Sequence, residues 1–520
     1  MKKGYVIASA VMLAIVNALF IYFGLPVVSI HNPLLWLMAM IDATVIAVMF
    51  LVAKQPKAFK ASTLVTGLLL IGLIVGAISS TRLLNARRYT ALLDIKTEEK
   101  VALPGVKDLK QIPLMDTESS KVLGNRKIGA LSDIVSQFEV SDNYMTISWK
   151  DSPVKVSPLV YAGLWKWSAN RDKGVPGYVM VRPNDLTAEY VELKEGMKYV
   201  PSACFSEDLA RHIWAHYPTV FFDNLHFEID EQGNPYYVAT IYEHNIGLFG
   251  GKKITGAFVV DPVSGQISRY GTDDLPDWVD IVFYGDYIAK YFDIYGRLIN
   301  GYWNSWFGQK GLIESTTTTT YNSEGNAVRD NDFGYIVRGK DIYIYTGVTA
   351  VTNDESNIGY LMANERTGEI RVSYFESTDE DSVMRAAEGE VQEKGYRASF
   401  PSLIDINGTS AYVMVLKDNL GLVKMYAIVD ASQYSHMEVE DTLEKALNKF
   451  TSGSFSDDMK TVEITVRRCE LVVVSGQSYV YLVDTANNIY KAVFEEKMLL
   501  IEEGDVITIN TDGSWFTLND

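Results

Sequence analysis

Three long apolar runs open the chain, before any polar stretch of comparable length. They span residues 5–25, 34–53 and 61–80. Each is close to the roughly 20 residues with which a helix crosses the ~30 Å hydrocarbon core of a bilayer. A cleaved signal peptide would have a shorter apolar core and a small-residue cleavage site, and here two further runs follow at once. The pattern therefore predicts three retained transmembrane helices within residues 1–80, with the lipid bilayer as a partner.

Basic residues set the predicted orientation of these helices. Those of the first 80 residues are Lys2, Lys3, Lys54, Lys57 and Lys60, and the turn at 26–33 has no Lys or Arg. Because cytoplasmic loops are rich in Lys and Arg, we expect the N-terminus in the cytoplasm and residues 81–520 outside the cell membrane. Arg82, Arg87 and Arg88, just beyond the third run, favour the opposite orientation.

Small residues recur at helical spacing in two of the runs. They are Ala10, Ala14 and Ala18 in the first run, and Gly72, Gly76 and Ser80 in the third. Such faces allow helix backbones to approach closely in lipid. The pattern indicates helix packing, either within this three-helix unit or between protomers, and leaves that choice open.

One acidic residue, Asp42, lies near the middle of the second run. A carboxylate at this depth is costly unless it is protonated or partnered. Asn17 of the first run lies at about the same depth, so we expect an Asn17–Asp42 hydrogen bond that holds the two helices together. A proton or ion relay through Asp42 is the alternative, although no second acidic or basic residue lies in the three runs.

The region after residue 135 carries a recurring strand–turn–strand pattern. Copies begin at Gly177, Gly256, Gly359 and, more loosely, Met425. The turn residues are Asp261, Ser264 and Gly265 in one copy, and Asn364, Thr367 and Gly368 in another. This chemistry closes a tight hairpin. Repetition of the pattern indicates repeated structural units.

Helical patterns at 206–217, 383–395 and 441–450 flank these hairpins, which predicts an α+β fold of helices packed on antiparallel sheets. The expected order is three transmembrane helices in 1–80, a stalk or connecting region in 81–135, α+β units in 136–200 and 201–310, a connecting hairpin unit in 311–382, an α+β unit in 383–450, a linker in 451–460 and a small β-barrel in 461–520.

One strand pair resembles a known family. Its segments read Gly233-Asn-Pro-Tyr-Tyr-Val-Ala-Thr and Phe258-Val-Val-Asp-Pro-Val-Ser-Gly-Gln-Ile. They resemble PepSY-type domains, in which an apolar strand ends in Asp-x-x-[Ser/Thr]-Gly-x-[Ile/Val]. The resemblance covers residues 200–275, with a degenerate second copy at 383–450. It implies non-catalytic bacterial modules outside the membrane, linked to protease regulation or envelope assembly, although the insertion around 248–251 departs from the compact family form.

The last 60 residues carry five short strand patterns, at 462–466, 470–474, 478–484, 489–494 and 506–509. Their spacing resembles a small OB-like barrel. OB-folds often bind oligonucleotides, but the formal net charge of the chain is −18, and −22 lies after residue 80. Since so acidic a body repels phosphate backbones, nucleic acid is not expected as a partner.

Composition supports a folded protein of several units. The chain has 520 residues, of which 48% are hydrophobic and 22% charged, with 15 prolines, so it is neither disordered nor collagen-like. Its two cysteines, Cys204 and Cys469, allow at most one disulfide and leave their pairing open.

Candidate chemistry is sparse. His212 and His216 are four residues apart on an expected helix, and His226 is a possible third ligand, so these three are weak candidates for a metal site. No Glu follows His212, so the zinc-protease pattern is absent. The sequence also lacks a Gly-x-Ser-x-Gly elbow and a phosphate-binding Gly-rich loop. We therefore expect no catalytic residues, no cofactor and no enzymatic activity.

Aromatic residues are dense between 284 and 307. Tyr284, Tyr287, Tyr291 and Tyr295 fit one helix face, and Trp303 and Trp306 follow closely. Such a cluster is typical either of a core or of an interface between protomers, where tyrosine and tryptophan make large rigid contacts.

Together these patterns favour a non-enzymatic, membrane-anchored extracytoplasmic scaffold that forms a homo-oligomeric envelope assembly. A PepSY-type sensor or regulator that binds a peptide, a protease or a cell-wall component is the first alternative. A membrane conduit that uses Asp42 is the second.

Overall fold

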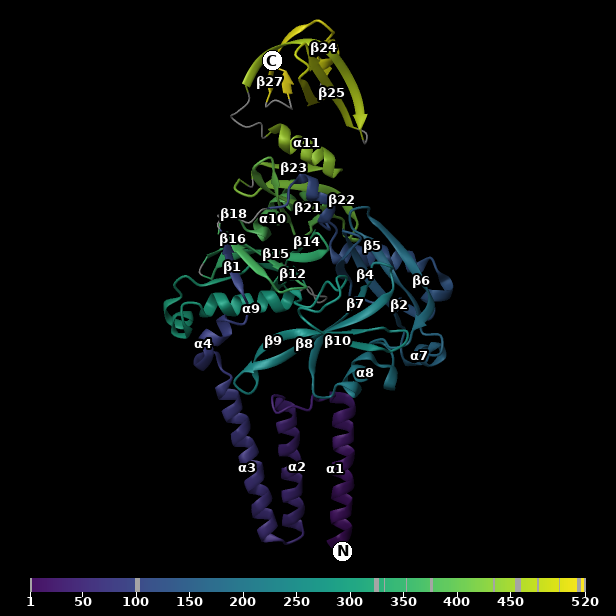
Figure 1. Ribbon diagram of the computed structural model, residues 1–520, viewed down its shortest axis with the longest axis vertical. Coiled ribbons are helices and arrows are strands. Elements are labelled where there is room, and N and C mark those ends of the chain that lie inside the picture. The colour runs from purple at the N-terminus through teal and green to yellow at the C-terminus, as the bar shows by residue number, and fades with distance from the viewer. Residues whose placement is uncertain are drawn as a thin grey trace.

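The computed structural model describes residues 2–98, 103–321, 327–331, 333–351, 353–374, 377–433, 435–453, 460–474, 477–494, 496–511 and 516–518. Three N-terminal helices stand side by side at one end of a long molecule, an α+β body lies in the middle, and a small C-terminal sheet lies at the far end (Figure 1). The predicted α+β class is thus confirmed.

Two antiparallel sheets of the body share its largest apolar core. The first sheet contains β2 (Phe138–Val140), β3 (Met145–Trp149), β4 (Ser152–Tyr161), β5 (Val175–Arg182) and β6 (Thr187–Met197). The second runs in the order β10-β9-β8-β7 and contains β7 (Phe221–Ile229), β8 (Pro235–Ile246), β9 (Gly250–Val260) and β10 (Ile267–Gly271). Helices α7 (Leu164–Asn170) and α8 (Leu209–His216) contribute side chains to the same core. Because the apolar side chains of both sheets form one buried cluster, the expected units 136–200 and 201–310 are joined through a common core.

A seven-stranded sheet forms the next layer. Its strands are β1 (Ile95–Glu98), β11 (Ile313–Ser315), β14 (Gly334–Arg338), β15 (Asp341–Ala350), β16 (Asn353–Asn364), β17 (Ile370–Ser373) and β18 (Ser377–Thr378). Helix α9 (Gly285–Leu298) packs on this sheet and shares its buried cluster. Strands β12 (Thr317–Tyr321) and β13 (Ala327–Asn331) pair separately as a hairpin.

Residues 81–98 and 103–135 contain defined elements where the sequence predicted a stalk or connecting region. They are α4 (Arg82–Thr90), β1, a 3₁₀ turn at Val106–Gln111, α5 (Thr117–Gly129) and α6 (Ser132–Val135). Strand β1 pairs in parallel with β17, far away in the sequence. Because two segments so far apart in the sequence leave no local pattern when they pair, the sequence predicted an irregular region here.

The unit expected at 383–450 contains a five-stranded sheet. Its elements are β19 (Arg397–Ala398), β20 (Ser402–Ile406), β21 (Thr409–Lys417), β22 (Val423–Asp430) and β23 (Met437–Glu440), with α10 (Glu380–Glu390) and α11 (Leu443–Gly453). Since α11 extends to Gly453, the expected linker begins later than residue 451, and residues 454–459 lie outside the described chain.

The predicted turn chemistry is confirmed at both hairpins. Ser264 Oγ donates to Asp261 Oδ2 at 2.6 Å, and Gly265 has a φ of +78° at the β9–β10 turn. Thr367 N donates to Asn364 Oδ1 at 3.0 Å at the β16–β17 turn. The side-chain oxygen of the first residue therefore closes each turn, and the glycine adopts the left-handed conformation.

The C-terminal sheet has five strands, but their boundaries differ from the expected ones. They are β24 (Lys460–Val474), β25 (Gln477–Asp484), β26 (Ile489–Val493), β27 (Val506–Thr511) and β28 (Phe516–Leu518), in the order β26-β25-β24-β27-β28. The two strands expected at 462–466 and 470–474 are one long strand, which pairs with β27 in its first half and with β25 in its second.

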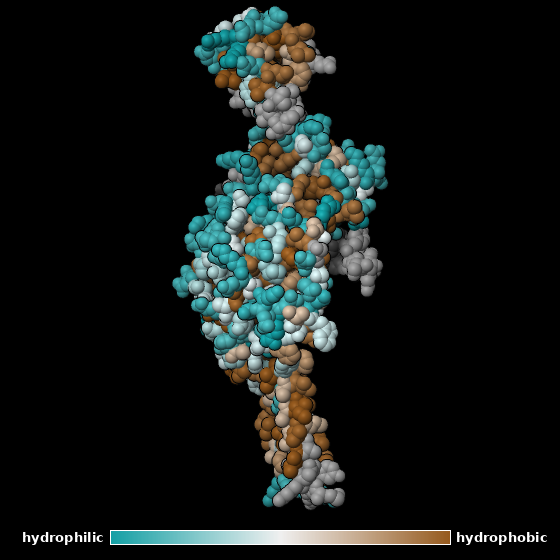
Figure 2. Space-filling model, turned by 90° about the vertical axis from the view of Figure 1, so that its right-hand side faces the viewer, coloured by the Kyte–Doolittle hydropathy of each residue, from teal (hydrophilic) through white to brown (hydrophobic). Residues whose placement is uncertain are grey.

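The N-terminal helices are α1 (Lys2–Gly24), α2 (Pro33–Val52) and α3 (Pro56–Ser79). Helices α2 and α3 are long and apolar enough to cross a membrane, and only 11% and 6% of their apolar windows are buried in the chain. The apolar part of α1 within the described residues, Ala10–Gly24, is shorter. Apolar side chains cover the visible face of this end of the molecule, whereas the body is mostly hydrophilic (Figure 2).

The tip of the β8–β9 hairpin contacts the ends of the N-terminal helices that lie next to the body. Phe249 N donates to Ser80 Oγ at 2.8 Å, and His31 Nδ1 lies 2.7 Å from Leu248 O. A Cβ atom at Gly76 would lie 2.4 Å from the Phe249 ring, so this glycine lets the hairpin tip reach α3. The segment 248–251 therefore contacts the apolar helices, and so does α8, because Arg211 Nη2 donates to Tyr22 O of α1 at 3.2 Å.

Candidate functional site

A cavity of about 490 Å³ lies where separate parts of the body meet, and we call it the junction pocket. Its walls come from the start of α5, from β4, from the start of α9, from β14 and β15, and from the segment 398–402 with β21. Volumes of 300–1,000 Å³ are typical of small-molecule sites, which often lie between domains. A cavity of about 540 Å³ elsewhere in the chain falls in the same range, so the volume makes the junction pocket a candidate binding site and its lining must decide.

Lys155 of β4 lines this pocket and is only 2% exposed. Its ammonium donates to Thr146 Oγ1 at 2.8 Å and to Thr117 Oγ1 at 3.2 Å, and it makes no ion pair with any described carboxylate. Burial lowers the pKa of Lys155 to about 8, against a smaller opposing effect of Asp116. A buried lysine without a carboxylate partner is rare and is typical of functional sites.

Lys417 of β21 lines another wall, and its charge is balanced. It forms ion pairs with Asp116 and, at 2.7 Å, with Glu118. Burial lowers the pKa of Lys417, but the two carboxylates outweigh burial and leave this pKa raised. Asp116 also caps α5, because its Oδ1 accepts from Ser119 N at 2.8 Å. This cluster fixes the helix start that forms one wall of the pocket.

Aromatic rings supply the apolar part of the lining. They are Phe333, Tyr335, Tyr345 and Phe400. The Phe333 and Tyr335 rings are 5.6 Å apart at 77°, and the Lys155 ammonium lies 5.5 Å from the centre of the Tyr335 ring. The Tyr345 hydroxyl donates to Ser402, which fixes the ring between the two sheets. The pocket thus combines an aromatic wall with a small number of charged groups.

Asp286 lies on the rim of the pocket, in the first turn of α9. Its side chain is exposed and forms no ion pair with the described part of the chain. A carboxylate in the first turn of a helix is stabilised by the helix dipole. The pocket therefore presents an unpaired cation at its wall and an unpaired anion at its rim.

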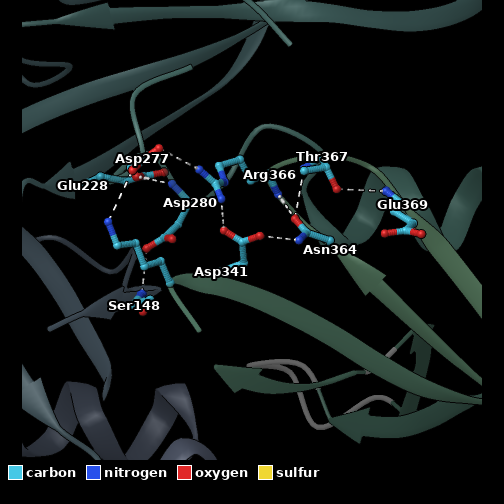
Figure 3. A network of polar contacts seen from close by, with 10 residues as sticks. Ser148, Glu228, Asp277, Asp280, Asp341, Asn364, Arg366, Thr367 and Glu369 are labelled. Carbon is cyan, nitrogen blue, oxygen red and sulfur yellow. Dashed lines mark hydrogen bonds and ion pairs between the residues drawn. The ribbon is translucent and has the colours of Figure 1, made fainter. Parts of the chain in front are cut away.

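A second polar network, around Glu228, lies in the joint between the sheets (Figure 3). Glu228 of β7 accepts hydrogen bonds from Asp280 N at 2.9 Å and from Ile281 N at 3.0 Å, and its Oε1 lies 2.8 Å from His226 Nε2. Asp280 Oδ2 accepts from Ser148 N of β3 at 2.7 Å. Burial, reinforced by Glu228, raises the pKa of Asp280 well above its usual range.

The same network continues to the seven-stranded sheet through Arg366, which pairs with Asp341 and, at 3.7 Å, with Asp277 (Figure 3). Asn364 Nδ2 donates to Asp341 Oδ2 at 2.7 Å. Since both oxygens of Glu228 are used by groups of the chain itself, we assign this network a structural role in joining the sheets.

The three candidate metal ligands are not brought together. His212 and His216 lie on α8 with ring centres 4.7 Å apart, and His212 Nε2 lies 2.7 Å from Gly265 O. His226 lies in the core on β7, where its ring nitrogens contact Asn224 O and Glu228. Within the described residues no group of three His, Cys, Asp or Glu side chains is placed to hold a metal. The strand after α8 directs His226 inward, which the spacing alone did not reveal.

The polar pair of the helices is present in the structure. Asn17 Nδ2 donates to Asp42 Oδ1 at 3.0 Å and also to Leu13 O at 3.0 Å. The predicted hydrogen bond thus joins α1 to α2.

The two small-residue faces differ in what covers them. A Cβ atom at Gly72 would lie 2.4 Å from the Trp36 ring of α2, and Gly76 contacts the β8–β9 hairpin tip. Packing within the chain therefore accounts for both glycines. Ala10, Ala14 and Ala18 of α1 are exposed.

The aromatic cluster divides into a core part and a surface part. Tyr287 and Tyr291 of α9 are 3% and 7% exposed and belong to the core under the seven-stranded sheet, with Tyr284 and Tyr295 packed beside them. Trp306, on the short helix Asn304–Gly308, and Trp303, which precedes this helix, are 66% and 64% exposed. Tyr287 and Tyr291 are thus not available as interface residues, Tyr284 and Tyr295 are half-buried, and the two tryptophans are exposed.

Sequence reasoning missed Lys155, although a signal was present. It is the only charged residue in the stretch 153–161, and valines precede and follow it. A lone lysine inside an otherwise apolar strand indicates a buried charge. The wall that this lysine faces comes from distant segments and has no local signature.

Comparisons with known proteins identify no family. No family model and no curated protein matches the sequence. Solved structures with weak similarity include an ancestral GH74 enzyme (9% identity, 71% of this chain and 43% of that chain, TM-score 0.17) and the Pyrococcus horikoshii acylaminoacyl peptidase (12%, 74% and 52%, 0.16). Another is Bacillus subtilis levansucrase (9%, 82% and 96%, 0.18).

This chain spans about half the length of the first two of these proteins. At such TM-scores the similarities carry no argument about fold or activity. The PepSY-like and OB-like resemblances stay predictions.

Proposed function

We propose that this protein is a membrane-anchored binding protein of the sensor type, which holds a small ligand in the junction pocket outside the cell membrane. The observation that supports it most is the unpaired, buried Lys155. Burying a charge without an opposite partner costs stability. A chain that keeps such a residue inside a pocket is best explained by a ligand that pairs with it.

The place of the pocket suits a sensor. Its walls belong to the first sheet, to the seven-stranded sheet and to the β19–β23 sheet. A ligand that contacts all three favours the arrangement in which the walls are closest, and so shifts the population of arrangements. The β8–β9 hairpin tip connects the same body to α2 and α3, which offers a mechanical path to the membrane.

The anchor in this proposal consists of α1, α2 and α3, all crossing the membrane. Exposed apolar helices of this kind are stable only in apolar surroundings. Lys54, Lys57 and Lys60 lie in and after the α2–α3 turn, at the end of the helices away from the body (Figure 1). With those lysines in the cytoplasm, the body is outside.

Thiol labelling tests this orientation. Cys204 and Cys469 are free and partly exposed in the body. We expect a membrane-impermeant maleimide to label the wild-type protein on intact spheroplasts. The matched control is Lys57→Cys in a chain that also carries Cys204→Ser and Cys469→Ser, which should label only after lysis. The reverse pattern would place the body in the cytoplasm.

A panel of small molecules tests ligand binding. Thermal unfolding of the full-length protein in mild detergent would be measured with neutral, cationic, anionic and zwitterionic compounds. We expect at least one class to raise the Tm of the wild type and to have no effect on Lys155→Met. If no class distinguishes the two proteins, the junction pocket is not a ligand site of this kind.

A homo-oligomeric scaffold is the second candidate, and the exposed tryptophans favour it. Trp303 stacks on Phe307, which is 82% exposed, with ring centres 5.9 Å apart. Exposed aromatic clusters of this type often mark protein interfaces.

Mass measurement in detergent tests the scaffold. For an oligomer that uses this cluster, Trp303→Ser with Trp306→Ser should reduce the protein mass to that of one 58.2 kDa chain. Trp165→Ser is the matched control, because Trp165 is 83% exposed on α7 and lies outside the cluster. A wild-type protein that is already monomeric would exclude the scaffold.

A further inference from the structure

We infer that the junction pocket takes a small zwitterion with an apolar or aromatic side chain, such as a free amino acid or a short peptide. The inference rests on the proposed function and names the ligand class of the same site. Three features of the lining carry it: an unpaired cation, an unpaired anion and an aromatic wall.

The unpaired cation is Lys155. A lysine ammonium has three N–H donors. Two of them contact the hydroxyls of Thr146 and Thr117, and no described carboxylate forms an ion pair with this group. One donor remains, and Asp116 balances the charge only in part, without an ion pair. A ligand carboxylate would supply the missing anionic oxygen with a strong charge-assisted hydrogen bond. Lys417 does not compete for this oxygen, because it already pairs with two carboxylates.

The unpaired anion is Asp286 on the rim. It lines the same cavity as Lys155 and has no ion-pair partner within the described chain. A ligand ammonium at this position gains a favourable interaction that a purely anionic ligand lacks. Asp116 and Glu118 add further negative charge to the lining, so a ligand with several negative charges is repelled.

The aromatic wall accounts for the rest of the ligand. Phe333, Tyr335 and Phe400 present ring surface to the cavity, and Met384 of α10 adds a flexible apolar side chain. Burying apolar ligand surface against these groups is favourable. The cavity of about 490 Å³ suits a single amino acid or a short peptide and is too small for a folded partner.

Calorimetric titration of the full-length protein in detergent tests the inference. The probes are L-phenylalanine and L-alanyl-L-phenylalanine, with L-phenylalanine amide to remove the carboxylate and N-acetyl-L-phenylalanine to remove the ammonium. We expect at least one zwitterion to bind, and each modification of phenylalanine to weaken binding at least tenfold. Tighter binding of L-phenylalanine would indicate a free amino acid as the ligand, and tighter binding of L-alanyl-L-phenylalanine would indicate a short peptide.

Variants connect each ligand charge to its protein partner. Lys155→Met should weaken the zwitterion to the level of the amide, and the amide should then bind this variant and the wild type alike. Asp286→Asn should weaken the zwitterion to the level of N-acetyl-L-phenylalanine, and the acetylated compound should then bind this variant and the wild type alike. Lys194→Met and Asp273→Asn are matched controls at exposed positions outside the pocket, and they should change nothing.

Two results would overturn the inference. If the acetylated compound binds as well as phenylalanine, the ligand is a simple anion, and only the proposed binding function survives. If neither zwitterion binds while another compound of the panel stabilises the wild type but not Lys155→Met, the ligand class is wrong, and the junction pocket is still the binding site. If no compound of the panel stabilises the wild type, both the zwitterion inference and the proposed binding function are wrong.

Discussion

Replacing Lys155 by methionine is expected to stabilise the protein at neutral pH. Burial lowers the pKa of this lysine from 10.5 to about 8. At about 1.4 kcal/mol for each pKa unit, the buried charge costs on the order of 3 kcal/mol. Loss of the two threonine hydrogen bonds costs about 1 kcal/mol each. We therefore expect a net gain of about 1 kcal/mol, together with loss of ligand binding.

The pH dependence of the free energy of unfolding distinguishes wild type and Lys155→Met more clearly than their difference at neutral pH. Below pH 8 Lys155 is protonated in both the folded and the unfolded chain, and its full penalty is present. Between about pH 8 and 10.5 the unfolded chain binds more protons at this position than the folded chain, so this lysine makes stability rise with pH. In Lys155→Met this rise is absent.

Urea unfolding followed by tryptophan fluorescence, at several pH values from 7 to 9.5, measures the difference between the two proteins. Lys194→Met is the control, because Lys194 is exposed on β6 of the same sheet. Equal pH slopes for wild type and Lys155→Met would show that Lys155 is not buried as a charge, and the main support for the binding function would be lost.

Local chemistry made much of the fold predictable. The Asp261 and Asn364 turns were readable because a side chain and a glycine a few residues apart specify a hairpin. Helix α9 was readable from the spacing of its tyrosines. In each case the interacting groups lie within one turn or one helix, so the sequence contains the whole argument.

Long-range contacts made the rest unpredictable. Strand β1 has a definite partner only once β17 is in place, and β24 looked like two strands because a β-bulge near Val466 interrupts its alternation. The junction pocket depends on the meeting of α5, β4, α9 and β21. Only Lys155 gave a local sign of it, as a charge among valines.

A second buried charge, Glu380, predicts an opposite pH dependence. Glu380 lies in the first turn of α10 and is 1% exposed. Its Oε2 accepts from Asn357 Nδ2 at 3.0 Å, whereas Oε1 has no hydrogen-bond partner in the described structure. Burial raises the pKa of Glu380 from 4.5 to about 7. Unlike Lys155, this residue is not part of the pocket lining.

The sign follows from proton binding. Between pH 4.5 and 7 the folded chain binds more protons at Glu380 than the unfolded chain, so this residue makes stability fall as pH rises. Above pH 7 the penalty is complete, on the order of 3 kcal/mol. Glu380→Gln keeps the shape and the hydrogen bond to Asn357 after an amide rotation, but it cannot ionise. We therefore expect the variant to lose this decline and to exceed the wild type in stability at pH 8.

Urea midpoints at pH 5 and pH 8 measure the effect. The advantage of Glu380→Gln over the wild type should be clearly larger at pH 8 than at pH 5. Glu390→Gln is the matched control, since Glu390 is exposed at the other end of α10 and should shift neither midpoint. A Glu380→Gln protein with the pH dependence of the wild type would mean that Glu380 ionises freely, which requires water to reach it in the folded state. Ligand binding in the same variant separates the two buried charges, because only Lys155 faces the pocket and only its replacement should affect affinity.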